Sequence, residues 1–284
     1  MNLEGRRESD NVEDRRRFGG GKATGLGIGG LVIVGIITWL MGGNPLDVLT
    51  NQLGNVTQNV AQQEPSAEND AMAHFAKQIL AGTEDVWTKE FQKMGRTYTP
   101  PRMVLFSGAT NSNCGGANAQ TGPFYCPVDQ TVYLDVSFFN QMKSQLGASG
   151  DFAYAYVVAH EVGHHVQHLL GTLDKVQQMQ SRSSEKVSNQ LSVRLELQAD
   201  FYAGVWAYND NKMFNSLQPG DLEKGLNAAS AIGDDRLQMQ SRGYTVPDAF
   251  NHGTSAQRVR WLKKGATTGD ISAGDTFSPN YSDL

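Results

Sequence analysis

The sequence predicts an α+β fold that is mainly helical, with a small antiparallel sheet and one N-terminal transmembrane helix. Three observations predict it. Residues 152–159 are an apolar run without proline or glycine, and residues 184–209 contain no proline, as is typical of long buried helices. Residues 102–106 and 131–136 are rich in β-branched and aromatic side chains and indicate strands that precede both helices. Residues 23–41 carry no charge at all.

The first segment, residues 1–22, is polar and mixes six basic with five acidic side chains. A segment with so few apolar residues cannot bury a core of its own. We therefore expect a flexible tail here.

The uncharged run is rich in Ile, Val, Leu and Gly, and Trp39 lies near its end. At about 1.5 Å per residue it would span ~28 Å, enough for the hydrocarbon core of a bilayer. It is longer than the apolar region of a signal peptide, and no small-x-small cleavage site follows, which favours an uncleaved anchor over residues 23–42. The basic residues before it predict a cytoplasmic N-terminus. The prediction is a single-pass protein of the bacterial inner membrane whose remaining domain is periplasmic or extracellular. An alternative interpretation of the N-terminal segment is a twin-arginine export signal at residues 15–18.

The rest of the chain is predicted to form one domain. Residues 43–70 are rich in Asn and Gln and indicate a linker. With 39% hydrophobic residues in 284, the chain can bury one sizeable core, which we place in residues 71–264. This domain begins with a helix over 71–94 and has another over 221–241. Residues 265–284 are rich in Gly, Ser, Thr and Asp and are expected to be a flexible tail.

Cys114 and Cys126 are the only cysteines and flank a glycine-rich loop. In an exported domain such a pair predicts a disulfide, which stabilises by about 3 kcal/mol through loop closure. In a cytoplasmic domain the two residues would be free thiols.

The net charge of −5, without a basic stripe outside the tail, argues against nucleic acid as a partner.

The motif His160-Glu161-Val162-Gly163-His164 carries the chemistry of the chain. Residues four apart on a helix lie one above the other, so both imidazoles can reach one ion. Glu161 would lie beside a metal-bound water and act as its general base. The apolar run before the motif and Gly171 after it place the motif late in a buried helix. The pattern predicts one catalytic Zn²⁺ ion.

A catalytic zinc site normally has three protein ligands, so a third must come from elsewhere. Glu196 and Asp200 are also four apart, in the second long helix, among Leu195, Leu197 and Phe201. We expect Glu196 to be the third ligand, and Asp200 to accept the outer N–H of a ligating histidine. The alternative, a solvated acidic helix face, does not fit these apolar neighbours.

The other histidines fit the zinc site less well. His168 continues the spacing of the motif, but it lies too far along the helix to join the first two ligands. The extended HExxHxxGxxH pattern would need glycine at 167 and histidine at 170, where this chain has Gln167 and Leu170. His165 points off the metal face and His74 lies in a distant helix, so both are interpreted as structural.

His252 lies in a loop before a short helix that contains Arg258. A loop imidazole can donate to the oxyanion that forms during hydrolysis, and an arginine can position substrate. The alternative is a surface histidine and a helix-stabilising arginine.

Four blocks of sequence resemble a known family. They are HEVGHHVQHLLG from His160, ELQAD from Glu196, GPFYCPVDQTVYLD from Gly122 and HGTSAQRVRW from His252. Together they resemble the bacterial neutral zinc metallopeptidase family, the YpfJ-like membrane-anchored zincins. The resemblance implies a zincin fold with a gluzincin site: His160, His164 and Glu196 as ligands and Glu161 as base. The chain is also similar to the HtpX-like and CaaX-protease metallopeptidases, which implies that His252 and Arg258 lie near the substrate.

The predicted function is a membrane-anchored endopeptidase that hydrolyses peptide bonds of protein or peptide substrates by zinc-activated water. Two alternatives remain open. One is a catalytically quiet protein that zinc stabilises and that acts as an interaction scaffold. The other is an amidase of cell-wall peptides.

Overall fold

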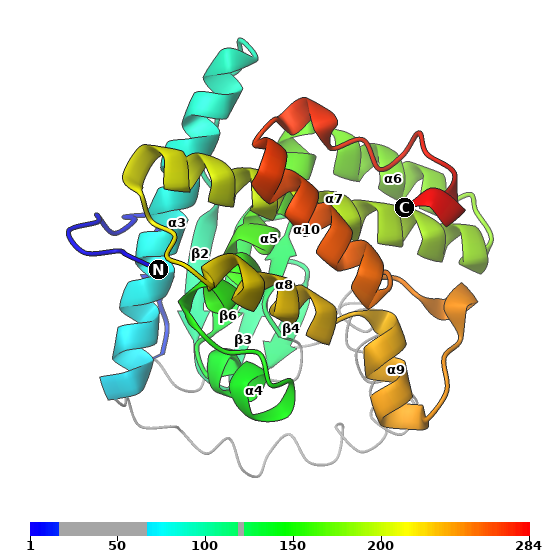
Figure 1. Cartoon of the computed structure of the whole chain (residues 1–284), viewed down its shortest axis with the longest axis horizontal. Coiled ribbons are helices and arrows are strands. Elements are labelled where there is room, and N and C mark those ends of the chain that lie inside the picture. The colour runs from blue at the N-terminus through cyan, green and yellow to red at the C-terminus, as the bar shows by residue number, and fades with distance from the viewer. Residues whose placement is uncertain (17–66, 119–121) are drawn as a thin grey trace.

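Helices pack against one face of a small mixed sheet (Figure 1). The computed structural model describes residues 1–16, 67–118 and 122–284. The strands are β1 (Val12–Asp14), β2 (Arg102–Phe106), β3 (Ala109–Ser112), β4 (Gly115–Asn118), β5 (Phe124–Cys126) and β6 (Thr131–Asp135). The helices are α3 (Ala67–Lys93), α4 (Phe138–Gln145), α5 (Asp151–Leu170), α6 (Thr172–Gln180), α7 (Glu185–Phe214), α8 (Asp221–Ala231), α9 (Asp234–Arg242) and α10 (Ser255–Thr268). The mainly helical α+β architecture agrees with the prediction.

The larger sheet has the order β1-β2-β6-β5. Strands β1, β2 and β6 are parallel, and only β5 runs antiparallel to its neighbour β6. The prediction of an antiparallel sheet is therefore wrong for its central pair. Between β2 and β6 the chain makes the β3–β4 hairpin and then β5, so that β6 re-enters beside β2 in the same direction.

The two faces of this sheet have different partners. Met103, Leu105, Val132 and Leu134 face the helices and belong to the main core. The alternate residues, among them Val104 and Tyr133, form a second cluster with Cys126 on the opposite face. The predicted disulfide between Cys114 and Cys126 is present, with a Cα–Cα distance of 5.8 Å, and joins the hairpin to β5.

The N-terminal segment (residues 1–16) is part of the domain and is not a free tail. Its strand β1 pairs in parallel with β2, and in Figure 1 the segment, in blue, lies beside α3. Arg6 forms an ion pair with the buried Asp210 of α7 at 2.8 Å, and Arg7 reaches Glu84 of α3 at 2.9 Å. A single membrane crossing by residues 23–42 would put a bilayer between this segment and the helices that it contacts. The predicted cytoplasmic N-terminus with the domain on the other side is therefore wrong.

Within residues 1–16, 67–118 and 122–284, no helix combines the length and the apolar character needed to cross a bilayer. The predicted transmembrane helix, and with it the single-pass inner-membrane location and the membrane as a partner, is corrected accordingly. The anchor predicted over 23–42 lies outside the described residues, as does most of the predicted linker.

Three helices approach one another unusually closely beneath the candidate site. A Cβ atom on Gly163 of α5 would lie 2.9 Å from the carbonyl oxygen of Ala199 of α7. A Cβ atom on Gly204 of α7 would lie 2.3 Å from the carbonyl oxygen of Leu262 of α10. Because real Cβ atoms do not come this close, glycine is required at both contacts. The contacts bring α5, α7 and α10 together around the middle of α7.

The C-terminal residues differ from the expected flexible tail. Helix α10 continues to Thr268, and Leu284 is 2% exposed. Arg194 of α7 donates hydrogen bonds to the carbonyl oxygens of Thr276 and Pro279. These contacts hold the last residues against α7.

Candidate metal centre

Helix α5 carries two of the predicted ligands on one face. It ends at Gly171, whose left-handed backbone (φ 77°) lets its N–H cap the carbonyls of Gln167 and His168. His160 and His164 lie one turn apart, with ring centroids 4.8 Å from each other. The sequence pattern and the helix geometry therefore agree on where the two imidazoles point.

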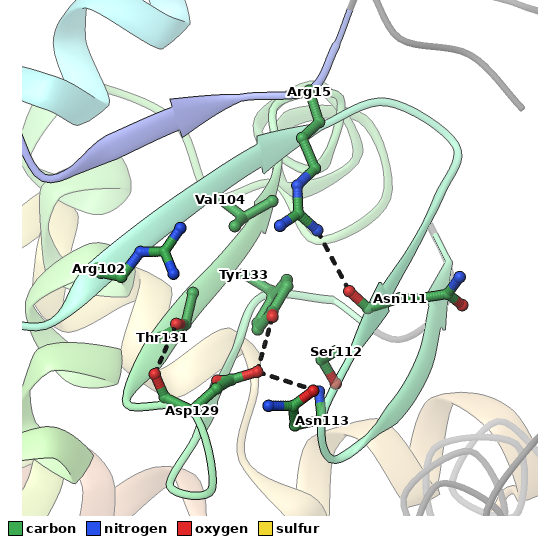
Figure 2. A pocket seen from close by; sticks show the side chains of 9 residues that line it. All are labelled: Arg15, Arg102, Val104, Asn111, Ser112, Asn113, Asp129, Thr131 and Tyr133. Carbon is green, nitrogen blue, oxygen red and sulfur yellow. Dashed lines mark hydrogen bonds between the residues drawn. The ribbon is translucent and has the colours of Figure 1, made fainter. Parts of the chain in front are cut away.

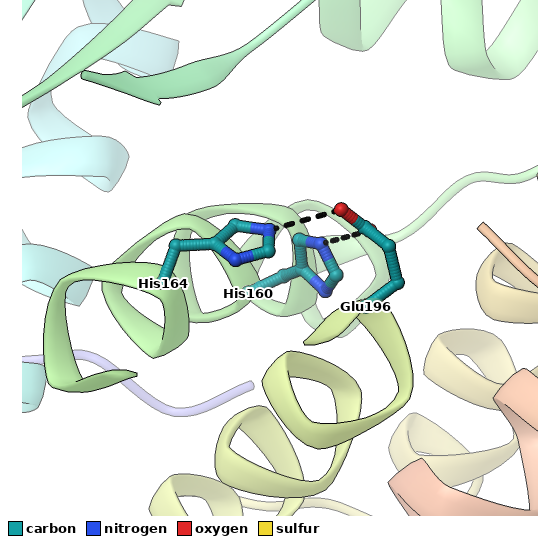
Figure 3. Close-up of side chains that lie close together, drawn as sticks. All are labelled: His160, His164 and Glu196. Carbon is teal, nitrogen blue, oxygen red and sulfur yellow. Dashed lines mark hydrogen bonds and ion pairs between the residues drawn. The ribbon is translucent and has the colours of Figure 1, made fainter. Parts of the chain in front are cut away.

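Glu196 of α7 completes the cluster (Figure 3). One carboxylate oxygen lies 3.1 Å from His160 Nε2 and the other lies 3.4 Å from His164 Nε2. One ligand atom from each residue lies within 4.8 Å of the others. Around a tetrahedral zinc ion with bonds of about 2.0–2.1 Å, neighbouring ligand atoms are ~3.3 Å apart. Both the donor types and the spacing fit zinc.

The charges of the cluster depend strongly on one another. Burial by itself would lower the pKa of His160, but the carboxylates of Asp200 and Glu196 raise it to about 10. Burial likewise opposes the rise in the pKa of His164, which Glu196 causes. The two histidines in turn hold the pKa of Glu196 well below its usual range despite its burial. A metal ion would have to displace the histidine protons to bind, as is usual for imidazole ligands.

Behind His160 lies a group of buried polar side chains that we name the Asp200 cluster: Asp200, Arg258, Tyr156 and His160. The Asp200 carboxylate accepts hydrogen bonds from His160 Nδ1 at 2.8 Å and from the Tyr156 hydroxyl at 2.6 Å. It also accepts two from Arg258, from Nε at 2.8 Å and from Nη2 at 3.0 Å. Because Nδ1 donates to Asp200, Nε2 is the nitrogen of His160 that faces Glu196 and that a metal ion would bind once its proton is lost.

His164 is oriented by an amide. Its Nδ1 lies 2.9 Å from the side-chain carbonyl oxygen of Gln167, which accepts a hydrogen bond from the Nδ1–H group. Gln167 is buried, and it donates to the Leu195 carbonyl at 2.7 Å and to Gln198 at 3.1 Å. Gln167 was not predicted as a partner of His164; its position three residues after His164, on the same helix face, was the available signal.

Arg258 does not face the open side of the site. Its side chain is 3% exposed, and its donors are taken by Asp200, by the Tyr156 oxygen and by the Ile232 carbonyl. The predicted role of Arg258 in positioning substrate stays a prediction, and in this structure its guanidinium group bonds Asp200. The residue instead balances the charge of Asp200 beneath the metal ligands.

His252 lies near the ligands and is one-third exposed. Its Nδ1 is 3.2 Å from the Asp234 carboxylate, which also accepts the backbone N–H groups of Asn251, His252 and Gly253. Burial lowers the pKa of His252, but Asp234 and Glu196 raise it overall. Asp234 was not predicted, and nothing in the local sequence distinguished it from any acidic residue at a helix start.

Glu161 lies beside the predicted ligands on α5 and is 8% exposed. Burial raises the pKa of its carboxyl above the usual range, while His160 and His164 oppose the rise. A carboxylate whose pKa is raised in this way accepts a proton more readily near neutral pH.

A hollow lies on the other face of the sheet (Figure 2). It measures about 200 Å³, and Arg15, Arg102, Asp129 and Tyr133 are among its lining residues. Both arginines pair with Glu13, and Asp129 accepts from the Tyr133 hydroxyl at 2.9 Å. These polar groups mostly satisfy one another, and the hollow contains none of the predicted site residues.

The family model described as "Putative neutral zinc metallopeptidase" matches residues 1–277. The chain belongs to this family. It is 49% identical over 285 residues to the uncharacterized protein YpfJ of Escherichia coli K12, covering 98% of this chain and 99% of that protein. It is 47% identical over 191 residues to the uncharacterized protein Mb2605 of Mycobacterium bovis, covering 64% of each. No solved structure matches the chain. The family assignment made from the four sequence blocks is confirmed.

Proposed function

We propose that this neutral zinc metallopeptidase family member is a zinc-dependent endopeptidase with a gluzincin-type site. His160, His164 and Glu196 would hold the ion. The observation that carries the proposal is the convergence of these three side chains from two helices, with Glu161 beside them. Asp200 and Gln167 support it, because each fixes the proton of one ligating imidazole on Nδ1.

The residues of the chain divide the work of hydrolysis. A bound zinc ion would act as a Lewis acid that polarises the scissile carbonyl and lowers the pKa of a water molecule. Glu161 takes the proton of the attacking water and passes it to the leaving amine. His252, whose Nδ1 is held by Asp234, presents Nε2 as a donor to the carbonyl oxygen on which negative charge develops.

The test is Glu161→Gln in the zinc-loaded protein, assayed for cleavage of an unfolded protein such as casein. We expect turnover to fall by at least ~10²–10⁴-fold with one zinc per chain retained, because the amide cannot accept the proton. The exposed Glu223, on α8, provides the control Glu223→Gln, which should cleave like the wild type. Chelator-sensitive cleavage at the wild-type rate by Glu161→Gln would refute Glu161 as the base. A zinc-loaded wild type that cleaves nothing would favour the scaffold.

A further inference from the structure

The C-terminal segment (residues 269–284) lies against one face of α7. Arg194 and Phe201 are seven residues apart on this helix and therefore share that face. The Thr276 hydroxyl donates to the Arg194 carbonyl at 2.7 Å, and the Arg194 guanidinium donates back to the Thr276 carbonyl. A Cβ atom on Gly274 would lie 2.5 Å from two carbon atoms of the Phe201 ring. The backbone around Gly274 is thus held both by hydrogen bonds and by close packing.

Gln198 lies between these two anchors on α7 and connects the segment to the candidate metal centre. Its side chain is buried, and its Nε2 donates to the Gly274 carbonyl at 2.9 Å. Its Oε1 accepts from Gln167 Nε2 at 3.1 Å. The side-chain oxygen of Gln167 lies 2.9 Å from His164 Nδ1. We name this chain of hydrogen bonds the amide relay: Gly274, Gln198, Gln167 and His164.

Two backbone carbonyls fix the direction of the hydrogen bonds in the amide relay. A carbonyl oxygen can only accept, so Gly274 receives the nitrogen of the Gln198 amide, whose oxygen then faces Gln167. Leu195 acts in the same way on Gln167, whose nitrogen donates to the Leu195 carbonyl at 2.7 Å. The oxygen of Gln167 is left for His164, which can bond it only through an Nδ1–H group. The other ring nitrogen, Nε2, is the one left for a metal ion.

A reversed Gln167 amide would oppose zinc binding. Its nitrogen would face His164 and favour the tautomer with the proton on Nε2, the nitrogen that the metal needs. The reversal would also set the Gln167 oxygen against the oxygens of Leu195 and Gln198. Gln198 cannot reverse along with it, because the Gly274 carbonyl has no proton to donate. The C-terminal segment therefore disfavours the arrangement that would block the ligand.

We propose that the C-terminal segment orients a metal ligand, and that Gln198 is the positioning residue through which it acts. The Gly274 carbonyl fixes Gln198, Gln198 fixes Gln167, and Gln167 keeps the proton of His164 on Nδ1. Gln198 acts through these neighbours and takes no part in the reaction itself. This inference rests on the proposed function, because it treats His164 as a zinc ligand.

The first experiment uses the metal-free full-length protein and needs no activity. Hydrogen exchange of the Gln167 side-chain amide, followed by NMR on ¹⁵N-labelled protein, should be slow in the wild type, because this amide donates two hydrogen bonds inside the fold. Gln198→Met keeps the length of the side chain but offers only a weakly accepting sulfur, so exchange should become at least about tenfold faster. An unchanged exchange rate in this variant would overturn the inference.

Asn209→Leu is the matched control. Asn209 is another buried amide of α7 that bonds the C-terminal segment, donating to the Gly269 carbonyl at 2.9 Å, but it has no bond to the amide relay. Its loss should leave the exchange of the Gln167 side chain at the wild-type rate. Equally fast exchange in Asn209→Leu and Gln198→Met would mean that general loosening of the segment is responsible, and would overturn the inference.

The second experiment measures zinc affinity by calorimetric titration. Gln198→Met should bind zinc roughly tenfold more weakly than the wild type, at the lower end of the range for groups that orient a ligating histidine. Gly274→Ala should show a similar loss, because its Cβ atom would push the segment away from Phe201 and from Gln198. Asn209→Leu should keep the wild-type affinity. Wild-type affinity in Gln198→Met, or an equal loss in Asn209→Leu, would contradict the proposal.

The double variant Gln198→Met, Gly274→Ala tests whether both residues act through one connection. Each single substitution breaks the same hydrogen bond, so the affinity of the double variant should stay within about twofold of that of the weaker single variant. Independent losses would multiply to about 100-fold and would contradict the amide relay. If the wild type binds no zinc, the proposed function fails, while the exchange experiment still decides whether the segment holds Gln167 through Gln198.

Discussion

The Asp200 cluster and the N-terminal segment both contain arginine–carboxylate pairs, but the pair of Arg15 with Glu13 is open to water, whereas the pair of Arg258 with Asp200 is not. Arg258 and Asp200 have side chains that are 3% and 0% exposed. In the pair of Arg15 with Glu13 the corresponding values are 33% and 43%. The same chemical contact therefore occurs in two dielectric environments within one molecule. Water screens the second pair and not the first, so we expect their energies to differ severalfold.

Burial also changes what happens when one partner is lost. An exposed arginine that loses its carboxylate is solvated by water, whereas a buried one keeps an uncompensated charge. Asp200 accepts four hydrogen bonds, two of them from Arg258. Because Arg258 is buried, water cannot replace these two bonds when Asp200 is removed. The comparison predicts large effects at the Asp200 cluster and small ones at the exposed pair of Arg15 with Glu13.

The largest effect is expected for Asp200→Ala. This variant leaves Arg258 buried without its partner and should lower the free energy of unfolding by about 3–5 kcal/mol. It also frees His160 Nδ1, so zinc affinity should fall by roughly 10–100-fold. Urea unfolding and calorimetric titration with zinc measure the two losses.

The double variant Asp200→Leu, Arg258→Met is the control for this first prediction. It removes both charges and should be less destabilised than Asp200→Ala, since no unpaired charge remains. If the double variant loses as much stability as Asp200→Leu and Arg258→Met lose together when each is measured alone, the two residues are not coupled.

The next effect concerns the backbone contact that brings Arg258 to Asp200. Gly204→Ala would place a Cβ atom 2.3 Å from the Leu262 carbonyl oxygen and force α10 away from α7. We expect about 2–3 kcal/mol of destabilisation from this overpacking. Gly116→Ala, where the nearest atom is 3.9 Å away, should lose less than ~1 kcal/mol in the same denaturation experiment. Equal losses would show that the helix contact is not tight.

A smaller effect is expected at the N-terminal segment. Arg15→Gln breaks the partly exposed pair with Glu13 and should lower the free energy of unfolding by at most about 1 kcal/mol. This difference should nearly vanish in 1 M salt, whereas the loss in Asp200→Ala should persist. Urea unfolding at low and high salt tests both statements, and a salt-insensitive loss in Arg15→Gln would contradict the comparison.

The smallest effect is a pH dependence at Asp14. Burial raises the pKa of Asp14, but hydrogen bonds from Arg16 outweigh it and hold the pKa below its usual range. A carboxyl whose pKa is lower in the folded state adds stability above its unfolded pKa, and this contribution disappears as the pH falls through the folded pKa. Asp14→Asn should therefore melt roughly 1–2 °C below the wild type at pH 7 and at the same temperature near pH 2. A difference that grows on acidification would contradict the assignment.

Several expectations about the fold and the site could be derived from local patterns. The spacing of His160 and His164, and of Glu196 and Asp200, fixes which side chains share a helix face, because helix geometry repeats regardless of context. The cysteine pair was predicted on similarly local grounds. By contrast, the tail, the anchor and the antiparallel sheet were inferred from composition, which contains no information on which segments touch.

The residues that were missed or misjudged show the same limit. Arg258 was expected to meet substrate, and the close contact of α7 with α10 instead points it at Asp200. Asp234 and Tyr125 come from elements far along the chain from their partners His252 and His165. His165 was correctly placed off the metal face, but its partner on β5 could not be read from its own helix.

By itself, the sequence determined the residue types of the candidate metal cluster, their helical spacing and the family, since these depend on residue identity and on the repeat of one helix. Only the tertiary structure decided that residues 1–16 pack into the domain, that Arg258 is buried beside Asp200, and that the Tyr125 hydroxyl meets His165. Those outcomes depend on which buried charges and unpaired backbone groups meet across elements. Long-range packing determines which of these groups meet, because a buried polar group is stable only where a partner from another part of the chain reaches it.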